Sequence, residues 1–408
     1  MKGTMLTACL IGVVIGLCLG VSVWAEEKMP VVESRPPIET LVVEQKPLIQ
    51  MAILLDTSGS MSGLIDQART ELWAIVNEFI FAKRNGKEPE LQVALYEYGK
   101  SSLSSEVGYI RQIVPLTTDL DKISEELFAL KTNGGQEYCG WVIKEATQLL
   151  QWSSSPDDLK VIFIAGNEPF TQGPVDYKKS CKAAVSKGII VNTIHCGSHE
   201  QGISGKWKDG SLLADGQYLN INHNHRAVQI EAPQDKVLIE LGNGLNGTYI
   251  VYGARGRQFK ANQVAQDLNA LNVSGANASS RAMTKSSQFY RNDSWDIVDA
   301  LKHDKVKLEE IKNEDLPENM QKMSMEERKA YVESNAKKRA EIQKKIQALN
   351  EQRKKYVAEE MKKLQRRGET LGSAMIQAVR RQATARNFKF ESSTEAAKKA
   401  EVKPQTKK

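Results

Sequence analysis

One short stretch, residues 51–63, constrains the fold of this chain more than any other. Its apolar run ends at Asp56, and Ser58 and Ser60 follow at alternate positions. A short, unbroken apolar run suits a strand that is buried on both faces of a parallel sheet. Residues 64–81 then show the apolar periodicity of a helix. The polar loop is therefore expected at the carboxyl end of a strand, where open α/β sheets bind ligands.

The side chains of Asp56, Ser58 and Ser60 offer one carboxylate and two hydroxyls around one point. Hard divalent cations such as Mg²⁺ prefer oxygen ligands and usually keep some water. The same residue types also form turns that cap a following helix, which gives the loop a purely structural interpretation as well.

The pattern D-x-S-x-S after an apolar strand resembles the metal-ion-dependent adhesion site of von Willebrand factor type A domains, which include the inserted domains of integrins. The order of elements that follows also resembles that fold, over residues 48–250. The resemblance implies a doubly wound, mostly parallel, six-stranded α/β sheet of the Rossmann-like kind. The C-terminal region resembles the helical extensions of some secreted bacterial type A proteins.

Strands and helices are expected to alternate along residues 48–250, which favours a doubly wound sheet. The apolar runs predict strands at residues 49–55, 91–98, 109–114, 159–165, 189–195 and 216–221. The helical periodicities predict helices at residues 64–83, 120–130, 139–152, 175–187 and 233–245.

Two of the three loops that form the family's metal site depart from its pattern. The family places a threonine in the second loop, where residues 134–138 have Glu137, and an aspartate in the third loop, where residues 165–169 have Gly166. Our hypothesis is that Glu137 binds the cation directly, because two carboxylates offset the dehydration of a divalent ion. The alternative is a degenerate site that keeps the shape of the loop without metal. The expected ligands are Asp56, Ser58, Ser60 and Glu137.

The expected ion is one Mg²⁺, with Mn²⁺ or Ca²⁺ as alternatives, and no small-molecule cofactor is expected. Asn133, Asn167 and Glu168 are expected at the rim of the site or behind the direct ligands. The resemblance implies that an acidic side chain of a protein partner completes the coordination of the ion.

The N-terminus has the layout of a secretory signal peptide over residues 1–25. Lys2 precedes the apolar segment 5–23, and small residues lead to a cleavage site after Ala25. An uncleaved membrane anchor is the alternative. Residues 26–47 are interpreted as a linker. The chain is therefore expected to be periplasmic or secreted, which excludes nucleic acid as a partner.

Three cysteines follow the signal segment, namely Cys139, Cys181 and Cys196. An oxidising compartment allows one disulfide and one free thiol, and the spacing does not select the pair. Cys139 begins a predicted helix and His195 ends a strand at the same edge, so a thiol hydrolase is a minor alternative. The chain has no recognisable oxyanion loop, P-loop or G-x-S-x-G motif. We therefore expect a binding protein rather than an enzyme.

The C-terminal half changes in character. Residues 251–301 are interpreted as an irregular connector that packs on the type A domain, and within it residues 272–287 lack a packing pattern. Residues 302–386 are a charged helical region, and residues 387–408 a disordered basic tail. A helix without Gly or Pro is predicted for residues 325–367.

The apolar stripe of that helix is interrupted at Arg353, where a coiled-coil seam requires an apolar residue. The helix is thus predicted to be a thin coiled coil, a protruding arm, or a helix folded back on itself. Residues 302–408 hold 28 basic and 17 acidic residues, a net charge of +11, which leaves −5 for residues 1–301. A basic helical region can contact envelope or cell-surface components.

Two functional interpretations follow from these features. The leading one is a metal-dependent module for protein binding or adhesion outside the cytoplasm. The alternative is a scaffold of an envelope complex that acts through its helical arm with a metal-free site. His223 and His225 alternate in a loop and are interpreted as polar surface.

Overall fold

Strand β1 (Leu48–Asp56) lies at the centre of the sheet and is buried from Ile49 onward. The computed structural model describes residues 46–224, 227–363 and 370–390. The signal peptide, all but the last two residues of the linker, His225 and the tail after Phe390 lie outside them. The sheet has the order β4-β3-β1-β5-β6-β7. This confirms the predicted six-stranded, mostly parallel architecture.

The other strands surround β1 in the register of a doubly wound sheet. Strand β3 pairs in parallel with one edge of β1, and β5 pairs in parallel with the other. Strands β6 and β7 extend the parallel side, and β4 pairs antiparallel with β3 at the opposite edge. Their bounds are Glu90–Tyr98 for β3, Ile110–Thr117 for β4, Leu159–Gly166 for β5, Ile190–Cys196 for β6 and Tyr218–Ile221 for β7.

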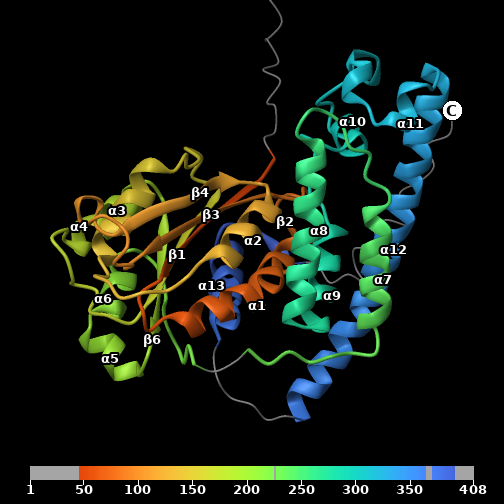
Figure 1. Ribbon diagram of the computed structural model, residues 1–408. Coiled ribbons are helices and arrows are strands. Elements are labelled where there is room, and N and C mark those ends of the chain that lie inside the picture. Colours follow the sequence, from red (N-terminus) through yellow and green to blue (C-terminus); the bar gives the residue numbers. More distant parts are fainter. Residues whose placement is uncertain (1–45, 225–226, 364–369, 391–408) are drawn as a thin grey trace, which may run out of the picture. The chain divides into compact units, whose positions relative to one another are not determined.

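Helices cover both faces of the sheet, because alternate side chains of β1 point to two apolar clusters. Ile53 and Leu55 belong to one cluster, and Ala52 and Leu54 belong to the other. The first face is covered by α1 (Ser62–Glu78), α2 (Leu120–Ala129) and α13 (Leu371–Ala385), as Figure 1 shows. The second face is covered by α3 (Cys139–Leu149), α4 (Tyr177–Ser186) and α6 (Trp207–Leu212), and α5 (His199–Ser204) packs on α6 and the end of β6.

Helix α13 belongs to the core of the domain although it follows the long charged region. Leu371, Met375 and Val379 are buried in the same cluster as the apolar face of α1. The start of α13 is fixed by Glu71, whose carboxylate accepts hydrogen bonds from the Thr370 hydroxyl at 2.5 Å and the Gly372 main-chain N–H at 2.6 Å.

The chain remains ordered beyond α13, which differs from the predicted start of the tail at residue 387. Strand β8 (Lys389–Phe390) pairs antiparallel with β2 (Ala82–Lys83), and Phe388 is buried. The apolar side chains of Phe388 and Phe390 explain the difference, because they add to the core cluster rather than to a solvated tail.

Residues 251–301 form helices rather than an irregular connector. Helix α9 (Gly275–Lys285) packs among α1, α7 (Asp235–Asn246) and α8 (Gly256–Val273). Its small and polar side chains are buried because they find partners: Asn277 donates to the Thr70 carbonyl at 2.9 Å, and the Thr284 hydroxyl donates to Asn77 at 2.7 Å. The predicted lack of a packing pattern was wrong here, since hydrogen bonds replace an apolar stripe.

The long helix α12 (Met325–Lys363) packs on its own chain against α7, α9 and α10 (Ile297–Lys302). It runs as one helix of 39 residues and does not fold back on itself. Arg353 interrupts the apolar stripe because its Nε donates to Asp235 at 2.5 Å. A short helix α11 (Glu318–Gln321) precedes it. No helix in the described ranges is long and apolar enough to cross a membrane.

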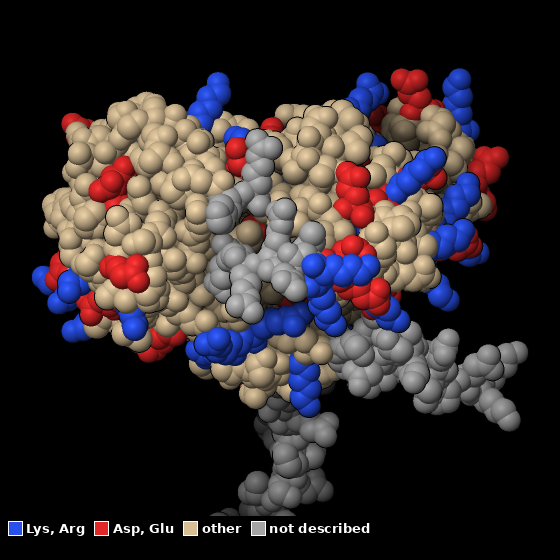
Figure 2. Space-filling model, turned by 90° about the horizontal axis from the view of Figure 1, so that it is seen from below, with Lys and Arg blue, Asp and Glu red and all other residues tan. Residues whose placement is uncertain are grey.

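Charge is unevenly distributed over the surface. In Figure 2, the half that holds α12 carries many Lys and Arg side chains with Asp and Glu among them, whereas the half that holds α5 and α6 has a few groups of both charges on a larger uncharged surface. This agrees with the net positive charge that residues 302–408 carry in the sequence.

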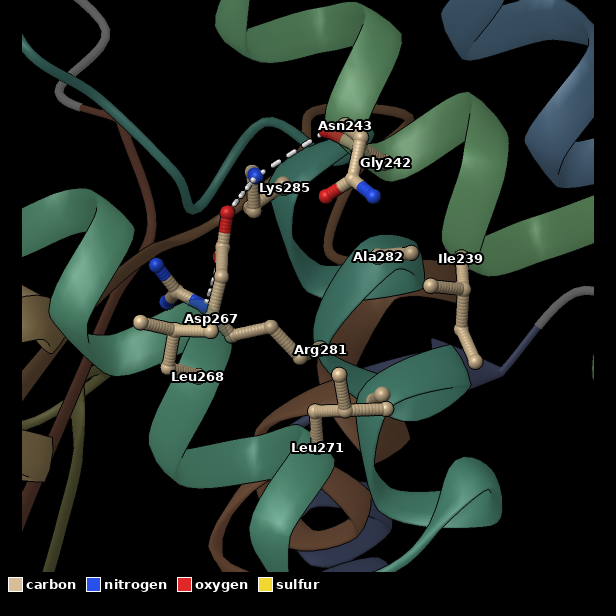
Figure 3. Close-up of a pocket in the computed structure, with 10 residues that line it drawn as sticks. Ile239, Gly242, Asn243, Asp267, Leu268, Leu271, Arg281, Ala282 and Lys285 are labelled. Carbon is tan, nitrogen blue, oxygen red and sulfur yellow. Dashed lines mark hydrogen bonds and ion pairs between the residues drawn. The ribbon is translucent and has the colours of Figure 1, made fainter. Parts of the chain in front are cut away.

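A small cavity of about 100 Å³ lies among α7, α8 and α9 (Figure 3). Leu268 and Leu271 of α8 and Ile239 of α7 line it together with the aliphatic parts of Arg281 and Lys285. Lys285 donates to the Asp267 carboxylate at 2.7 Å and to the Asn246 side chain at 2.6 Å. Its charge is therefore neutralised within the fold.

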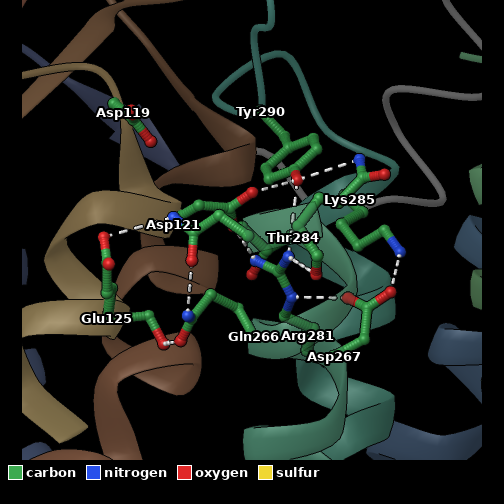
Figure 4. Close-up of polar contacts among 12 residues, drawn as sticks. Asp119, Asp121, Glu125, Gln266, Asp267, Arg281, Thr284, Lys285 and Tyr290 are labelled. Carbon is green, nitrogen blue, oxygen red and sulfur yellow. Dashed lines mark hydrogen bonds and ion pairs between the residues drawn. The ribbon is translucent and has the colours of Figure 1, made fainter. Parts of the chain in front are cut away.

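Buried Arg281 of α9 joins α2 to α8 (Figure 4). Its guanidinium pairs with Asp121 of α2 at 2.6 Å and with Asp267 of α8 at 2.8 Å, and it lies over the ring of Trp73. The Tyr290 hydroxyl donates to the same Asp121 carboxylate at 2.5 Å. Two carboxylates balance Arg281 and Lys285, so this cluster is structural and needs no external ligand.

Buried Arg339 anchors the long helix to the rest of the chain. Its guanidinium pairs with Asp296 at 2.7 Å and with Asp299 at 2.8 Å, and it donates to the Thr248 carbonyl at 2.7 Å. It also lies over the ring of Tyr249 at 4.1 Å.

Replacing Arg339 leaves two buried carboxylates without their cation. We expect Arg339→Met to lower the free energy of unfolding by about 3–5 kcal/mol. Urea denaturation of the full chain measures this change. The control is Lys338→Met, which removes an exposed cation from the neighbouring position of α12. Similar unfolding midpoints for the two variants would contradict the role of Arg339.

Candidate functional site

Three loops meet at the carboxyl end of the sheet. The first follows β1, the second precedes α3, and the third follows β5. The main-chain N–H of Asn133 in the second loop donates to the Thr57 carbonyl in the first at 3.1 Å. The Asn167 side chain in the third loop donates to the Ser60 hydroxyl at 3.3 Å. The loops thus come together as the order of strands predicts.

Asp56 is fully buried at the end of β1, with one carboxylate oxygen lacking a partner. Its Oδ1 accepts a hydrogen bond from the Ser58 main-chain N–H at 2.7 Å. Its Oδ2 has no hydrogen-bond donor among the described residues, and the buried Ser58 hydroxyl has no partner there either. Buried polar atoms normally find partners, so these two oxygens indicate a missing ligand or water.

Glu137 approaches the same point from the second loop and is 5% exposed. Gly99, at the end of β3, shows how closely the two carboxylates converge. A Cβ atom at Gly99 would lie 2.8 Å from Glu137 Cγ and 2.9 Å from Asp56 Oδ1. The main-chain N–H of Glu137 donates to Gln172 at 2.6 Å, which fixes this part of the loop.

Both carboxylates hold their protons more tightly than usual. Burial, helped by the neighbouring charge of Glu137, raises the pKa of Asp56 to about 7. Burial, helped by the charge of Glu168, raises the pKa of Glu137 to about 7. Two buried carboxylates without a cation disfavour ionisation, and a bound divalent ion reverses that preference.

The remaining predicted residues lie around this pair in different ways. Ser60 is exposed at the mouth of the loop, and Asn167 reaches it with its amide nitrogen while its Oδ1 stays buried without a partner. Glu168 is half-buried, and its main-chain carbonyl accepts the Trp207 indole N–H at 2.8 Å. The Asn133 side chain accepts a hydrogen bond from Ser101 at 3.0 Å, so it is engaged beside the site.

The structure leaves no room at position 166 for the aspartate that the type A family places there. A Cβ there would lie 2.5 Å from the Tyr98 hydroxyl and 3.0 Å from Asp56 Oδ2. The Tyr98 hydroxyl donates to the Ala165 carbonyl at 3.0 Å. Tyr98 therefore fills the space of the missing side chain. Sequence reasoning missed this residue, although its place at the end of the neighbouring strand β3 was a usable signal.

The donor set fits a hard cation better than a soft one. In the described part of the chain, no three His, Cys, Asp or Glu side chains gather closely enough to hold a metal. The Asp56 and Glu137 side chains lie beside each other here, and the loop after Asp56 also carries the buried Ser58 and the exposed Ser60. Oxygen ligands of this kind, completed by water, suit Mg²⁺, Mn²⁺ or Ca²⁺.

The three cysteines are buried free thiols, so the disulfide that the sequence allowed is not formed among them. Cys139 and Cys181 belong to the apolar cluster on one face of the sheet, and Cys196 to the cluster on the other. The Cys139 thiol donates to the Tyr98 hydroxyl at 3.8 Å, and burial raises its pKa well above the ordinary value. His195 contacts the Asn167 carbonyl at 3.3 Å rather than a thiol. This geometry offers no activated nucleophile at these residues.

Comparison with known proteins identifies the fold of this region. Residues 50–202 match the family model of the von Willebrand factor type A domain. No curated protein matches the chain.

Several solved structures are similar to this region. One is the conserved hypothetical protein BatB from Bacteroides thetaiotaomicron, which is 15% identical with a TM-score of 0.32. The match covers 42% of this chain and 90% of that chain. The SpRpn10 VWA domain has 17% identity, coverage of 43% and 88%, and a TM-score of 0.33. An aerotolerance-related membrane protein from Bacteroides fragilis NCTC 9343 has 15% identity, coverage of 43% and 93%, and a TM-score of 0.30.

The raised pKa values make the metal-free fold sensitive to pH. Ordinary values are 3.8 for Asp56 and 4.5 for Glu137, against about 7 for each in the fold. Between these values the folded state binds more protons than the unfolded state, so the free energy of unfolding falls as the pH rises toward about 7. Asp56→Asn removes one of the two carboxylates that make the free energy of unfolding fall as the pH rises.

We therefore expect Asp56→Asn to stabilise the chelator-treated protein above pH 7 by a few kcal/mol, on the order of the shift in pKa, and to change little near pH 4. Thermal denaturation at both pH values measures this. Glu88→Gln, which removes an exposed carboxylate, is the control. An equal effect of Asp56→Asn at the two pH values would disprove the raised pKa.

Proposed function

Because residues 50–202 form a von Willebrand factor type A domain, we propose that this chain is an extracytoplasmic protein-binding module that uses one divalent cation. The observation that carries the proposal is the convergence of Asp56 and Glu137 beside the unpartnered Ser58 hydroxyl. Its predicted secretory signal supports a periplasmic or secreted location.

In this proposal Asp56, Ser58, Ser60 and Glu137 hold the ion, which is Mg²⁺ or alternatively Mn²⁺ or Ca²⁺. A bound cation with an open coordination position supplies a point of attachment for an acidic side chain. Asp56 is held in place by its own loop through the Ser58 N–H, so its other oxygen is oriented before the ion arrives. Glu137 supplies the second negative charge that the missing aspartate at position 166 would otherwise provide.

The proposed contact face surrounds the mouth of the site. Ser60, Asn133 and Gln136 are exposed there, on two of the three loops. Figure 2 shows separate Asp and Glu side chains on the half of the molecule that holds α5 and α6. A carboxylate of a protein partner would therefore depend on the ion itself for its attraction to this surface. Adhesion is one use of this binding mode.

Glu137 distinguishes a working metal site from a degenerate one. We expect calorimetry with Mg²⁺ and Mn²⁺ to show one site per chain, and Glu137→Gln to weaken its affinity by more than about tenfold. Glu200→Gln, which removes an exposed carboxylate from α5, should leave the affinity unchanged. Equal binding by the wild type and Glu137→Gln would refute direct ligation by Glu137.

The alternative function is an envelope scaffold that acts through the long helix with a metal-free site. The observation that favours it is the excess of Lys and Arg over Asp and Glu in α12, which also packs against α7. Deleting residues 302–408 cannot separate the two functions, because it also removes the core helix α13. Surface substitutions on α12 are the suitable test.

Partner capture from an envelope extract should depend on the metal loop. We expect capture by the wild type with Mg²⁺, loss of capture with a chelator, and loss in Asp56→Asn. The double variant Lys344→Glu with Lys345→Glu changes exposed positions of α12 and should still capture the partner. Capture that survives the chelator but is lost in this double variant would favour the scaffold.

A further inference from the structure

An open cavity of about 670 Å³ lies at the opposite end of the sheet, where β5 and β6 begin. The loop between α3 and β5 lines one side of it, the end of α4 a second side, and Arg386 after α13 a third. A cavity of this size suits a small organic ligand. None of its residues belongs to the proposed metal site.

Three basic side chains line this cavity, and none of them forms an ion pair within the described ranges. Lys160 Nζ donates to the Ser153 carbonyl at 2.8 Å, and Lys187 Nζ donates to the Thr147 carbonyl at 2.9 Å. Arg386 donates to the Pro156 carbonyl. The carbonyl groups hold the three cations in position but carry no negative charge to pair with them.

Lys160 is the buried member of this set, with 3% of its surface exposed. Burial and the nearby charge of Arg386 lower the pKa of Lys160. The charge of Asp158 raises the pKa of Lys160 in part, but this carboxylate pairs with Arg84 at 3.1 Å and accepts the Ser153 hydroxyl at 2.7 Å. An anion in the cavity would therefore relieve the repulsion between Lys160 and Arg386.

The walls of the cavity are fixed before any ligand binds. Buried Gln50 donates to the Gln151 carbonyl at 3.1 Å and accepts the Ser153 main-chain N–H at 2.7 Å. The Trp152 indole N–H donates to the Ala146 carbonyl at 2.9 Å, which orients its ring. A Cβ at Gly188 would lie 3.5 Å from Lys160 Nζ, so the lysine borders the chain just before β6. Such preorganisation reduces the cost of binding.

We propose that this cavity binds a small molecule that carries a phosphate group, with Lys160, Lys187 and Arg386 around the oxyanion and the ring of Trp152 beside the rest of the ligand. Three cations without an ion pair in the described residues match the charge of a phosphate group, and their nitrogen donors match its oxygen acceptors. The half-buried Trp152 ring provides a flat wall of the kind against which a sugar or another ring packs.

Calorimetry on the full chain with two probes tests this site. Inorganic phosphate probes the oxyanion position, and a hexose monophosphate also probes the wall formed by Trp152. We expect both to bind at physiological ionic strength, and Lys187→Gln and Arg386→Gln each to weaken binding by about tenfold or more. Lys182→Gln is the matched control. It removes an exposed charge from α4, the helix whose end lines the cavity.

The two probes separate the sources of the phosphate group. Tighter binding of the hexose monophosphate, lost in Trp152→Ala, assigns the site to a phosphorylated ring compound, and equal binding assigns it to free phosphate. Lys160→Met tests the buried charge. If that variant does not fold, Lys187→Gln and Arg386→Gln still test the site. Absence of binding by both probes, or equal weakening in Lys182→Gln, would overturn the proposal. Chelators should not alter phosphate binding. A failure of the phosphate proposal is therefore distinguishable from a failure of the proposed metal site.

Discussion

Burial of the central strand on both faces is the constraint from which the rest of the structure follows. Strand β1 hydrogen-bonds to β3 and β5, and its side chains enter two apolar clusters, so that helices must cover the sheet on both sides. The chain meets this demand on one face partly with α13, which lies far along the sequence. The six-stranded sheet and the C-terminal region therefore share one core.

The same strand places a carboxylate where water is scarce. Asp56 follows directly on the buried run, and Glu137 lies beside it, so both ionised forms are disfavoured. Proteins retain such costly arrangements at functional sites, where a cation or a proton compensates the charge. The Tyr98 hydroxyl fills the space beside Gly166 where an aspartate side chain would lie. The second carboxylate beside Asp56 is therefore that of Glu137.

The predicted strands and the loop after β1 could be recognised from sequence because they depend on local patterns. The period of apolar residues marks buried strands, and the residues after β1 carry their chemistry in a short motif. The role of Tyr98 was not recognised, because it depends on two strands that are distant in the sequence. The packing of α9 was also missed, because hydrogen bonds bury its polar side chains without an apolar period. Arg353 interrupted the stripe of α12 for a similar reason, since its partner Asp235 lies on another helix.

We propose that one cation binds between Asp56, Ser58 and Glu137. A crystal structure of the full chain grown with Mn²⁺ tests it most directly, because the anomalous scattering of manganese locates the ion without reference to the protein atoms. The account predicts one strong peak within bonding distance of the Asp56 and Glu137 carboxylates and the Ser58 hydroxyl. A map without a peak at these residues, with the two carboxylates bound to water or to each other through a shared proton, would contradict it.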